Sequence, residues 1–168
     1  MATIGELLNM KFNKASKTQT LSGSNTTVAT PLFRITGVVN VTQLYAVVTT
    51  ALGSNVTAAY YRLNDQTAQV DITLATGSTL SNFEAGSLIN KKALSGSAVS
   101  VRRANAGVVN EGATAGVDVL SPFMVVEKPT ANTDIEFVYT TTNTPTSGVI
   151  QHFVEWQPLS ENSTLTVL

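Results

Sequence analysis

The fold is decided by residues 32–50, which read LFRITGVVNVTQLYAVVTT. Apolar and polar side chains alternate along this stretch with a period of two, which is typical of a half-buried β-strand. One face is expected to carry Phe33, Ile35, Val39, Val41, Tyr45 and Val47, and the other Arg34, Thr36, Asn40 and Thr42. The pattern predicts either one long strand or two strands that bend at Gly37.

Strand-like runs continue toward the C-terminus, with turn residues between them. They cover residues 56–64, 69–76, 97–103, 116–127, 133–141, 148–158 and 163–168. The alternation is clearest in residues 69–76, where Val70, Ile72 and Leu74 are expected on one face. About eight short strands at this spacing predict an all-β fold, an antiparallel sandwich or barrel.

One segment between the strands, residues 77–89, departs from this period. Ser78 or Thr79 is placed to cap one or two helical turns that carry Leu80 and Phe83, and Gly86 is placed to end them. The sequence therefore predicts one short inserted helix.

The N-terminal residues differ from the rest of the chain. Ile4, Leu7 and Leu8 recur at helical spacing, with Phe12 after them, so a short amphipathic helix or arm is expected. Such a helix needs a surface to lie on, in its own domain or in a neighbour. Residues 13–31 are rich in Ser, Thr and Asn and predict an extended polar arm. The expected division is residues 1–30 for these segments and 31–168 for the β-domain.

Composition narrows the classes of function. Charged residues make up 12% of the 168 residues and the formal net charge is −1, so no basic field for nucleic acid is expected. The absence of cysteine excludes disulfides and thiolate metal sites. No secretory signal or membrane-spanning run is visible. A product made in the cytoplasm, with no membrane partner, is expected.

The rarest side chains in the chain lie close together. His152 and Trp156 are the single histidine and the single tryptophan, and both fall in the strand predicted over residues 148–158. On a strand they point to the same side, together with Ile150 and Val154. No nucleophile signature surrounds a serine, so we expect a hydrogen-bonded structural role for His152. Trp156 is expected to anchor the core or an interface.

The acidic residues offer no familiar ligand spacing. Asp134 and Glu136 alternate on one predicted strand face, which matches no calcium loop, and one histidine cannot build a zinc site. These carboxylates are expected to be solvated. No metal, no cofactor and no catalytic activity are expected.

Three stretches resemble the small virion proteins of tailed bacteriophages: residues 35–61, ITGVVNVTQLYAVVTTALGSNVTAAYY; residues 70–89, VDITLATGSTLSNFEAGSLI; and residues 154–168, VEWQPLSENSTLTVL. Within that group the chain looks most like a head decoration (cement) protein or a minor capsid component. The resemblance implies a homo-oligomer, with a trimer favoured, that binds the major capsid protein on the outside of the virion. It carries over no individual residue.

A role as a decoration protein predicts contact surfaces in place of an active site. The candidate interface residues for capsid or sister subunits are Ile4, Leu7, Leu8, Phe12 and Trp156. One alternative is a receptor- or carbohydrate-binding module of a tail fibre, with Tyr45, Tyr60, Tyr61 or Trp156 as stacking platforms. Another is a tail-tube or connector component, and a small hydrolase is the remotest.

Overall fold

The computed structural model describes residues 13–73, 75, 79–90, 100–102, 122–143 and 148–168. The described part is all-β and without helix, and every strand pairing in it is antiparallel, as the sequence predicts. Sheet A has the order β1 (Asn13–Thr20), β10 (Val149–Pro158), β3 (Val38–Thr50), β6 (Leu88–Asn90) and β7 (Ser100–Arg102), with β8 (Phe123–Val126) also on β3. Sheet B has the order β11 (Thr164–Val167), β2 (Thr27–Thr36), β9 (Thr133–Thr141), β4 (Val56–Asn64) and β5 (Gln69–Asp71).

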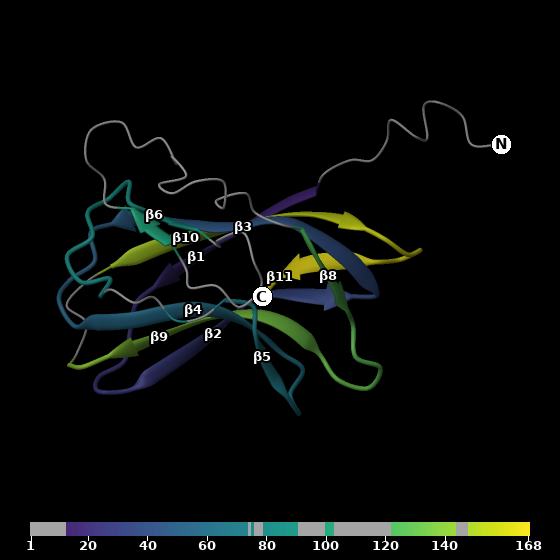
Figure 1. The fold of residues 1–168 in the computed structure, drawn as a ribbon, viewed down its shortest axis with the longest axis horizontal. Coiled ribbons are helices and arrows are strands. Elements are labelled where there is room, and N and C mark those ends of the chain that lie inside the picture. The colour runs from purple at the N-terminus through teal and green to yellow at the C-terminus, as the bar shows by residue number, and fades with distance from the viewer. Residues whose placement is uncertain (1–12, 74, 76–78, 91–99, 103–121, 144–147) are drawn as a thin grey trace, which may run out of the picture.

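The two sheets face each other across one apolar core (Figure 1). Phe137 of sheet B and His152 of sheet A have ring centroids 4.7 Å apart, so side chains from the two sheets touch directly. The largest fully buried side chains come from both sheets and their connections: Tyr61, Tyr139, Phe33, Phe137, Leu32, Ile35, Leu44, Leu52, Leu80, Ile89 and Ile135. Burial of this apolar surface is the main source of stability.

Gly37 separates two strands that belong to different sheets. β2 ends at Thr36 in sheet B and β3 begins at Val38 in sheet A. Gly37 has a φ of +72°, and a Cβ at this position would lie 2.5 Å from the Oγ of Ser163. A residue without a side chain is therefore required where the chain crosses between sheets.

The predicted buried face of residues 32–50 is right for its first half and wrong for its second half. Phe33, Ile35, Val39 and Val41 are buried, but Leu44, Ala46 and Val48 replace Tyr45 and Val47 on the inner face. The pairing with β10 explains the change: Glu155 lies opposite Gln43 and Trp156 opposite Val41, which leaves Thr42 as an extra residue. A bulge of one residue moves every later side chain to the other face.

The segment with the clearest alternation, residues 69–76, forms only a short strand. β5 ends at Asp71, and Val70 is exposed whereas Ile72 is buried, so these two side chains do not share a face. The backbone N–H groups of Ile72 and Thr73 both donate to the carbonyl oxygen of Tyr61, at 2.9 and 3.1 Å. Because two successive N–H groups share one carbonyl acceptor, the alternation of side chains between the two faces is interrupted here. Leu74 lies outside the described residues.

The inserted helix predicted in residues 77–89 is wrong over the part of that segment that the structure describes. Residues 79–87 form two successive turns, closed by Phe83 N–H to Leu80 O at 3.4 Å and Ser87 N–H to Glu84 O at 3.1 Å. Asn82 has a φ of +63° and Gly86 a φ of +90°, conformations that end a right-handed turn. Leu80 and Phe83 are nevertheless buried, so the two turns place in the core the same apolar side chains that the predicted helix would have placed there.

The polar arm expected over residues 13–30 is part of the sheets instead. Asn13–Thr20 pair with β10 as β1, and Thr27 begins β2. The sequence pattern does not reveal this strand because β1 turns polar side chains inward, among them Gln19, which is buried. The segment that carries Ile4, Leu7, Leu8 and Phe12 lies outside the described residues.

Candidate interaction surface

His152 occupies the centre of sheet A. It lies on β10 between Lys17 of β1 and Ala46 of β3, and its side chain is fully buried on the inner face with Ile150, Val154 and Trp156. Both ring nitrogens are within hydrogen-bond distance of a partner. Nδ1 lies 3.1 Å from the hydroxyl of Tyr61, and Nε2 lies 2.9 Å from Oε1 of Gln19. The prediction that His152 is a hydrogen-bonded structural residue is confirmed.

The hydrogen bonds of His152 form part of a directed chain. The Oε1 of Gln19 only accepts, so Nε2 of His152 carries the proton and Nδ1 accepts from Tyr61. The amide nitrogen of Gln19 in turn donates to Oγ1 of Thr30 at 2.7 Å. The chain runs from β4 of sheet B through β10 and β1 of sheet A to β2 of sheet B. Four polar side chains thus join the two sheets.

Burial keeps this chain neutral. Desolvation, with a smaller contribution from the positive charge of Lys17, lowers the pKa of His152 to about 3. Desolvation also raises the pKa of the Tyr61 hydroxyl well above its usual range. Because His152 is fully buried and both its nitrogens are engaged, the arrangement stabilises the core and presents no base to a substrate.

The aromatic residues that were candidates for stacking on a ligand lie in two environments, the core and the outer faces of the sheets. Tyr61 is fully buried and Trp156 is 8% exposed within the core, so the structure removes both from the candidates for stacking on a sugar. Tyr45 is half-buried on the outer face of sheet A, where its ring stacks on Phe153 with a centroid distance of 5.0 Å. Tyr60 is half-buried on the outer face of sheet B. The core position of Trp156 is established, and its role at an interface stays a prediction.

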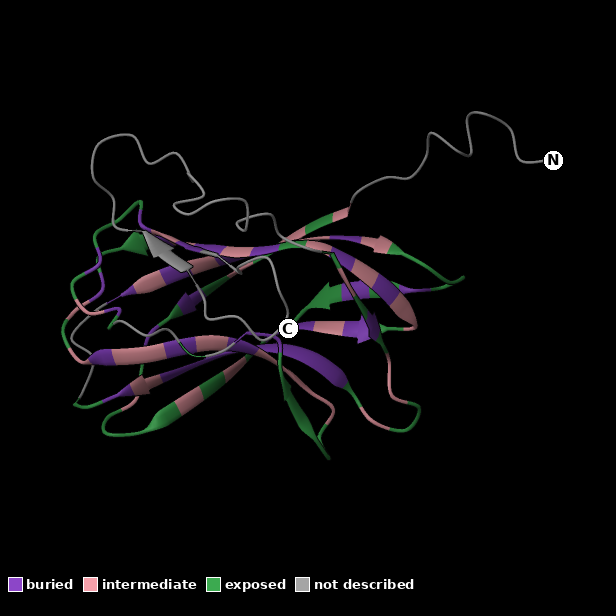
Figure 2. Ribbon diagram, in the orientation of Figure 1, coloured by how far each residue is buried: buried purple, intermediate pink, exposed green. Residues whose placement is uncertain are grey.

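The outer face of sheet B holds a network of charged side chains. Arg34 makes two hydrogen bonds to Asp134, at 2.8 and 3.0 Å, and Arg62 donates to Glu136 at 2.7 Å. Asn64 donates to the other oxygen of Glu136 at 2.9 Å. Figure 2 shows β9 buried along nearly its whole length, although its outer face carries Asp134 and Glu136 beside Val138.

The expectation that Asp134 and Glu136 are solvated is therefore wrong. Both carboxylates are buried, because arginines on the flanking strands β2 and β4 fold over the central strand. Their oxygens accept hydrogen bonds from these arginines and from Asn64, so the carboxylates are satisfied within sheet B. Among the described residues there is no group of three or more His, Cys, Asp or Glu that could hold a metal ion.

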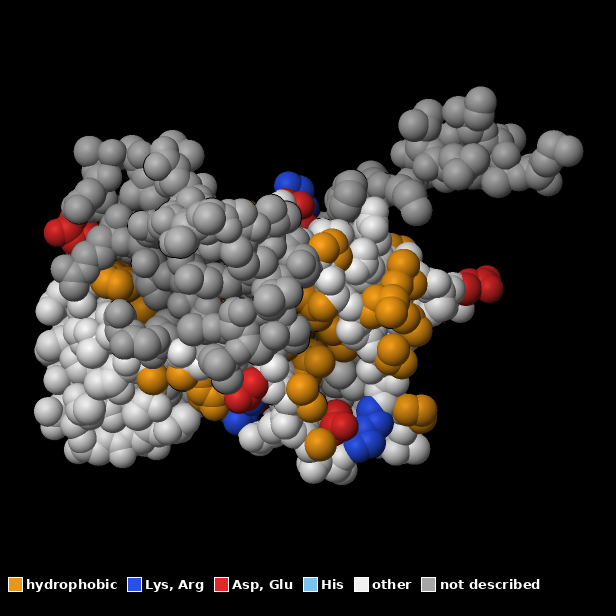
Figure 3. Space-filling view, viewed as in Figure 1, with side chains coloured by type: hydrophobic (Ala, Val, Ile, Leu, Met, Phe, Trp, Pro, Cys, Tyr) orange, Lys and Arg blue, Asp and Glu red, His pale blue; other side chains and the backbone are white. Residues whose placement is uncertain are grey.

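Large apolar side chains are exposed at one end of sheet A. Met124 is 70% exposed, Val126 63% and Leu159 48%. Val38 lies opposite Val126 on one side, and its carbonyl oxygen accepts the N–H of Leu159 on the other. These four residues, which we call the end surface, cover the ends of three adjacent strands. Figure 3 shows hydrophobic side chains gathered near β8.

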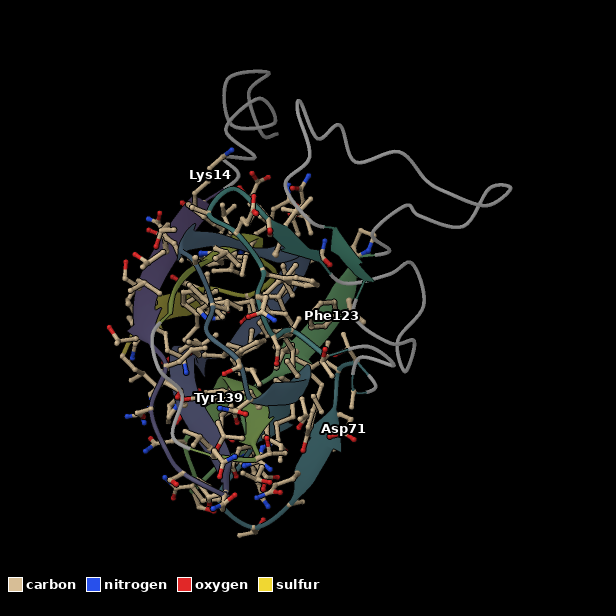
Figure 4. All side chains as sticks on the ribbon, turned by 90° about the vertical axis from the view of Figure 1, so that its left-hand side faces the viewer. Lys14, Asp71, Phe123 and Tyr139 are labelled. Atoms are coloured by element: carbon tan, nitrogen blue, oxygen red, sulfur yellow. The ribbon has the colours of Figure 1, made fainter. Side chains whose placement is uncertain are left out.

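A small hollow continues the end surface toward sheet B. Its volume is about 120 Å³, and it is lined by Leu63, Asp65, Ala68, Val70, Val126, Lys128 and Thr133. It lies between β5 and the end of β8, which run along the same side of the molecule in Figure 4, where Asp71 and Phe123 mark these strands. Four of its seven lining residues are apolar, so the hollow suits an aliphatic group.

An ion pair borders the hollow. Lys128 Nζ lies 3.0 Å from Oδ2 of Asp65, whose Oδ1 accepts from the backbone N–H groups of Thr67 and Ala68. The backbone hydrogen bonds, first that of Ala68, hold the pKa of Asp65 far below its usual range. The ion pair of Lys128 and Asp65 therefore lies at the edge of a hollow whose other lining residues are mostly apolar.

The opposite end of the molecule carries a hollow of different chemistry. Its volume is about 570 Å³, and it is lined by Asn25, Thr26, Thr27, Thr140, Thr141 and Thr142. Thr27 and Thr140 contact each other through their hydroxyl oxygens at 3.2 Å. The two ends thus differ sharply in polarity: among the described residues, Met124, Val126 and Leu159 are exposed on neighbouring strands at the β8 end, whereas the opposite hollow is lined by threonines and an asparagine.

One feature of the sequence predicts the end surface, although the alternation of apolar and polar residues does not. Residues 123–126, FMVV, are apolar on both faces of a strand. Phe123 and Val125 face the core, and Met124 and Val126 occupy the face that a half-buried strand normally fills with polar groups.

Within the described residues no helix has the length and apolar character needed to cross a membrane. Comparison of the chain with protein-family models, with curated proteins and with solved structures finds no match.

Proposed function

We propose that this chain is a structural subunit of a virion, a head decoration protein that oligomerises and binds the outer capsid lattice through many weak contacts. The observation that carries the proposal is the end surface, where Met124, Val126 and Leu159 are exposed on adjacent strands. Contiguous apolar exposure of this kind marks an interaction site on a soluble protein.

The chemistry of the remaining surface supports an assembly role. Only 12% of the residues are charged, so few charges have to be desolvated when protein surfaces meet. Two ion pairs with buried carboxylates, Arg34 with Asp134 and Arg62 with Glu136, are already satisfied within sheet B. We assign the end surface to contacts between copies of the chain. The oligomer, a trimer in our proposal, then binds the major capsid protein multivalently.

The proposed role involves no catalysis by this chain. The positive support is the state of His152, which is neutral, buried and hydrogen-bonded at both nitrogens. A general base has to reach the proton of a substrate. The side chain best suited to acid–base chemistry is instead used to join the sheets.

Capsid binding tests the proposal directly. Purified full-length protein is added to capsids of the source virus that lack it, and the particles are imaged by electron cryomicroscopy. Ordered density in many copies on the outer lattice is the expected result. A monodisperse, folded protein that leaves capsids bare and instead binds glycans would overturn the proposal in favour of a receptor-binding module.

A further inference from the structure

The start of β1 lies in register with the strands that form the end surface. Asn13 is opposite Trp156, Trp156 is opposite Val41, and Val41 is opposite Phe123. The row that follows outward along the strands contains Gln157, Asn40 and Met124. The chain before Asn13 therefore begins beside the row of Met124, about 14 Å away across three strand spacings.

The segment that precedes Asn13 is apolar, as the end surface is. Residues 1–12 read MATIGELLNMKF and contain only one acidic and one basic side chain, Glu6 and Lys11. Their large apolar side chains are Met1, Ile4, Leu7, Leu8, Met10 and Phe12. The hollow of about 120 Å³ beside Val126 has room for one aliphatic side chain.

The end surface is too small to hold two copies together face to face. It exposes three large side chains, Met124, Val126 and Leu159, whereas a stable interface buries roughly 800 Å² on each partner. A segment of twelve residues spans about 40 Å when extended, well over the roughly 14 Å that separates Asn13 from the row of Met124, so it is long enough to meet a neighbouring copy. Added to the end surface, it would enlarge the contact by several apolar side chains.

We propose that residues 1–12 of one copy bind the end surface of a neighbouring copy, with one aliphatic side chain of the segment in the hollow lined by Leu63 and Val70. This inference rests on the proposed self-association of the subunit. The contact joins two different surfaces, so it is heterologous and closes a ring when the rotation between copies is right. Three copies closed in this way would form the trimer of the proposed function.

The chain has no cysteine, so single introduced cysteines report this contact cleanly. Two full-length variants, Leu8→Cys and Met124→Cys, are mixed and treated with a short bismaleimide. We expect a heterodimeric product at about tenfold higher yield than in a mixture of Leu8→Cys with Thr27→Cys, whose cysteine lies exposed at the opposite end. Thr27→Cys is the matched control for an exposed strand position.

The oligomeric state gives a second, independent readout. By light scattering after size exclusion, the wild type is expected to be an oligomer, and both a chain that lacks residues 1–12 and Met124→Asp are expected to be monomers. Thr18→Asp, an exposed change on the outer face of β1, is expected to remain oligomeric. Far-ultraviolet circular dichroism confirms that each variant is folded.

Three results would overturn the inference. The first concerns a double variant, Leu8→Cys/Met124→Cys, that is mixed with excess wild-type protein. If it cross-links only within its own chain, the segment covers the end surface of its own subunit. Another is an oligomer that survives removal of residues 1–12, which would mean that the end surface binds a different part of a second copy. The third is an equal cross-linking yield of Leu8→Cys with Met124→Cys and with Thr27→Cys, which would mean that the segment has no preferred binding site on the neighbouring copy. Capsid decoration itself is decided separately, by the imaging experiment.

Discussion

Tyr61 on β4 and His152 on β10 connect the two sheets by a hydrogen bond of 3.1 Å in the interior of the protein. The contact also brings the two rings edge to face, with centroids 5.9 Å apart. Gln19 and Thr30 continue the connection back to sheet B. The histidine that first suggests catalysis thus has its clearest role in holding the core together.

Removal of the Tyr61 hydroxyl tests this connection. Tyr61→Phe leaves Nδ1 of His152 as a buried acceptor without a donor, so the free energy of unfolding is expected to fall by about 1–2 kcal/mol. Urea titration followed by tryptophan fluorescence measures the change. Tyr60→Phe, on the outer face of the same strand, is the matched control and is expected to change stability by less than about 0.5 kcal/mol. Equal effects of the two substitutions would contradict the structural role.

The buried imidazole makes stability depend on pH. The folded-state pKa of His152, about 3, is below the unfolded value of 6.5, so between these values the unfolded chain binds a proton that the folded chain does not. The contribution of His152 to the unfolding free energy is therefore constant above about pH 6.5 and falls by up to about 1.4 kcal/mol per pH unit below it.

The window from pH 6.5 to pH 4 isolates this effect. Asp65 has a folded pKa below its ordinary value of 3.8, so the stability it contributes is lost only under more acidic conditions. Unfolding of wild type and His152→Gln is compared at several pH values in this window. The slope is expected to be smaller by one bound proton in His152→Gln, and parallel curves for the two proteins would refute the assignment.

The charged network on sheet B makes a further prediction. Arg62→Ala leaves the buried carboxylate of Glu136 with only Asn64 as a side-chain partner, so a loss of about 3–5 kcal/mol is expected. Lys14→Ala removes an ion pair with Glu155 of similar length, 2.6 Å, but Lys14 is exposed, so little measurable change is expected. Chemical denaturation of both variants decides the matter, and a mild effect of Arg62→Ala would show that water replaces the guanidinium.

The crossing between the sheets depends on Gly37. Gly37→Ala places a Cβ against Ser163 and forces an alanine into a φ of +72°, so a loss of about 1–3 kcal/mol is expected. Ser24→Ala, in the exposed connection between β1 and β2, is the control and is expected to be neutral. Thermal unfolding by calorimetry measures both variants, and wild-type stability of Gly37→Ala would show that the crossing relaxes without strain.

The sequence by itself determined the class of fold and much of its inner face. A period of two, repeated between turn residues, encodes an antiparallel all-β chain because alternate side chains of a strand face opposite sides. The same rule places Ile150, His152, Val154 and Trp156 on one buried face of β10. The chain crossing at Gly37 also follows from a local feature, the lack of a side chain at that position.

Tertiary structure alone decided the features that depend on residues far apart in the chain. The bulge at Thr42 exists only through its register with β10, so no local pattern places Tyr45 outside and Leu44 inside. Gln19 is buried because His152 lies within hydrogen-bond distance, and Asp134 is buried because Arg34 covers it. The end surface arises where β3, β8 and β10 end side by side. A strand period is a property of neighbouring residues, whereas partners of a polar group and edges of a sheet are set by pairing across the fold.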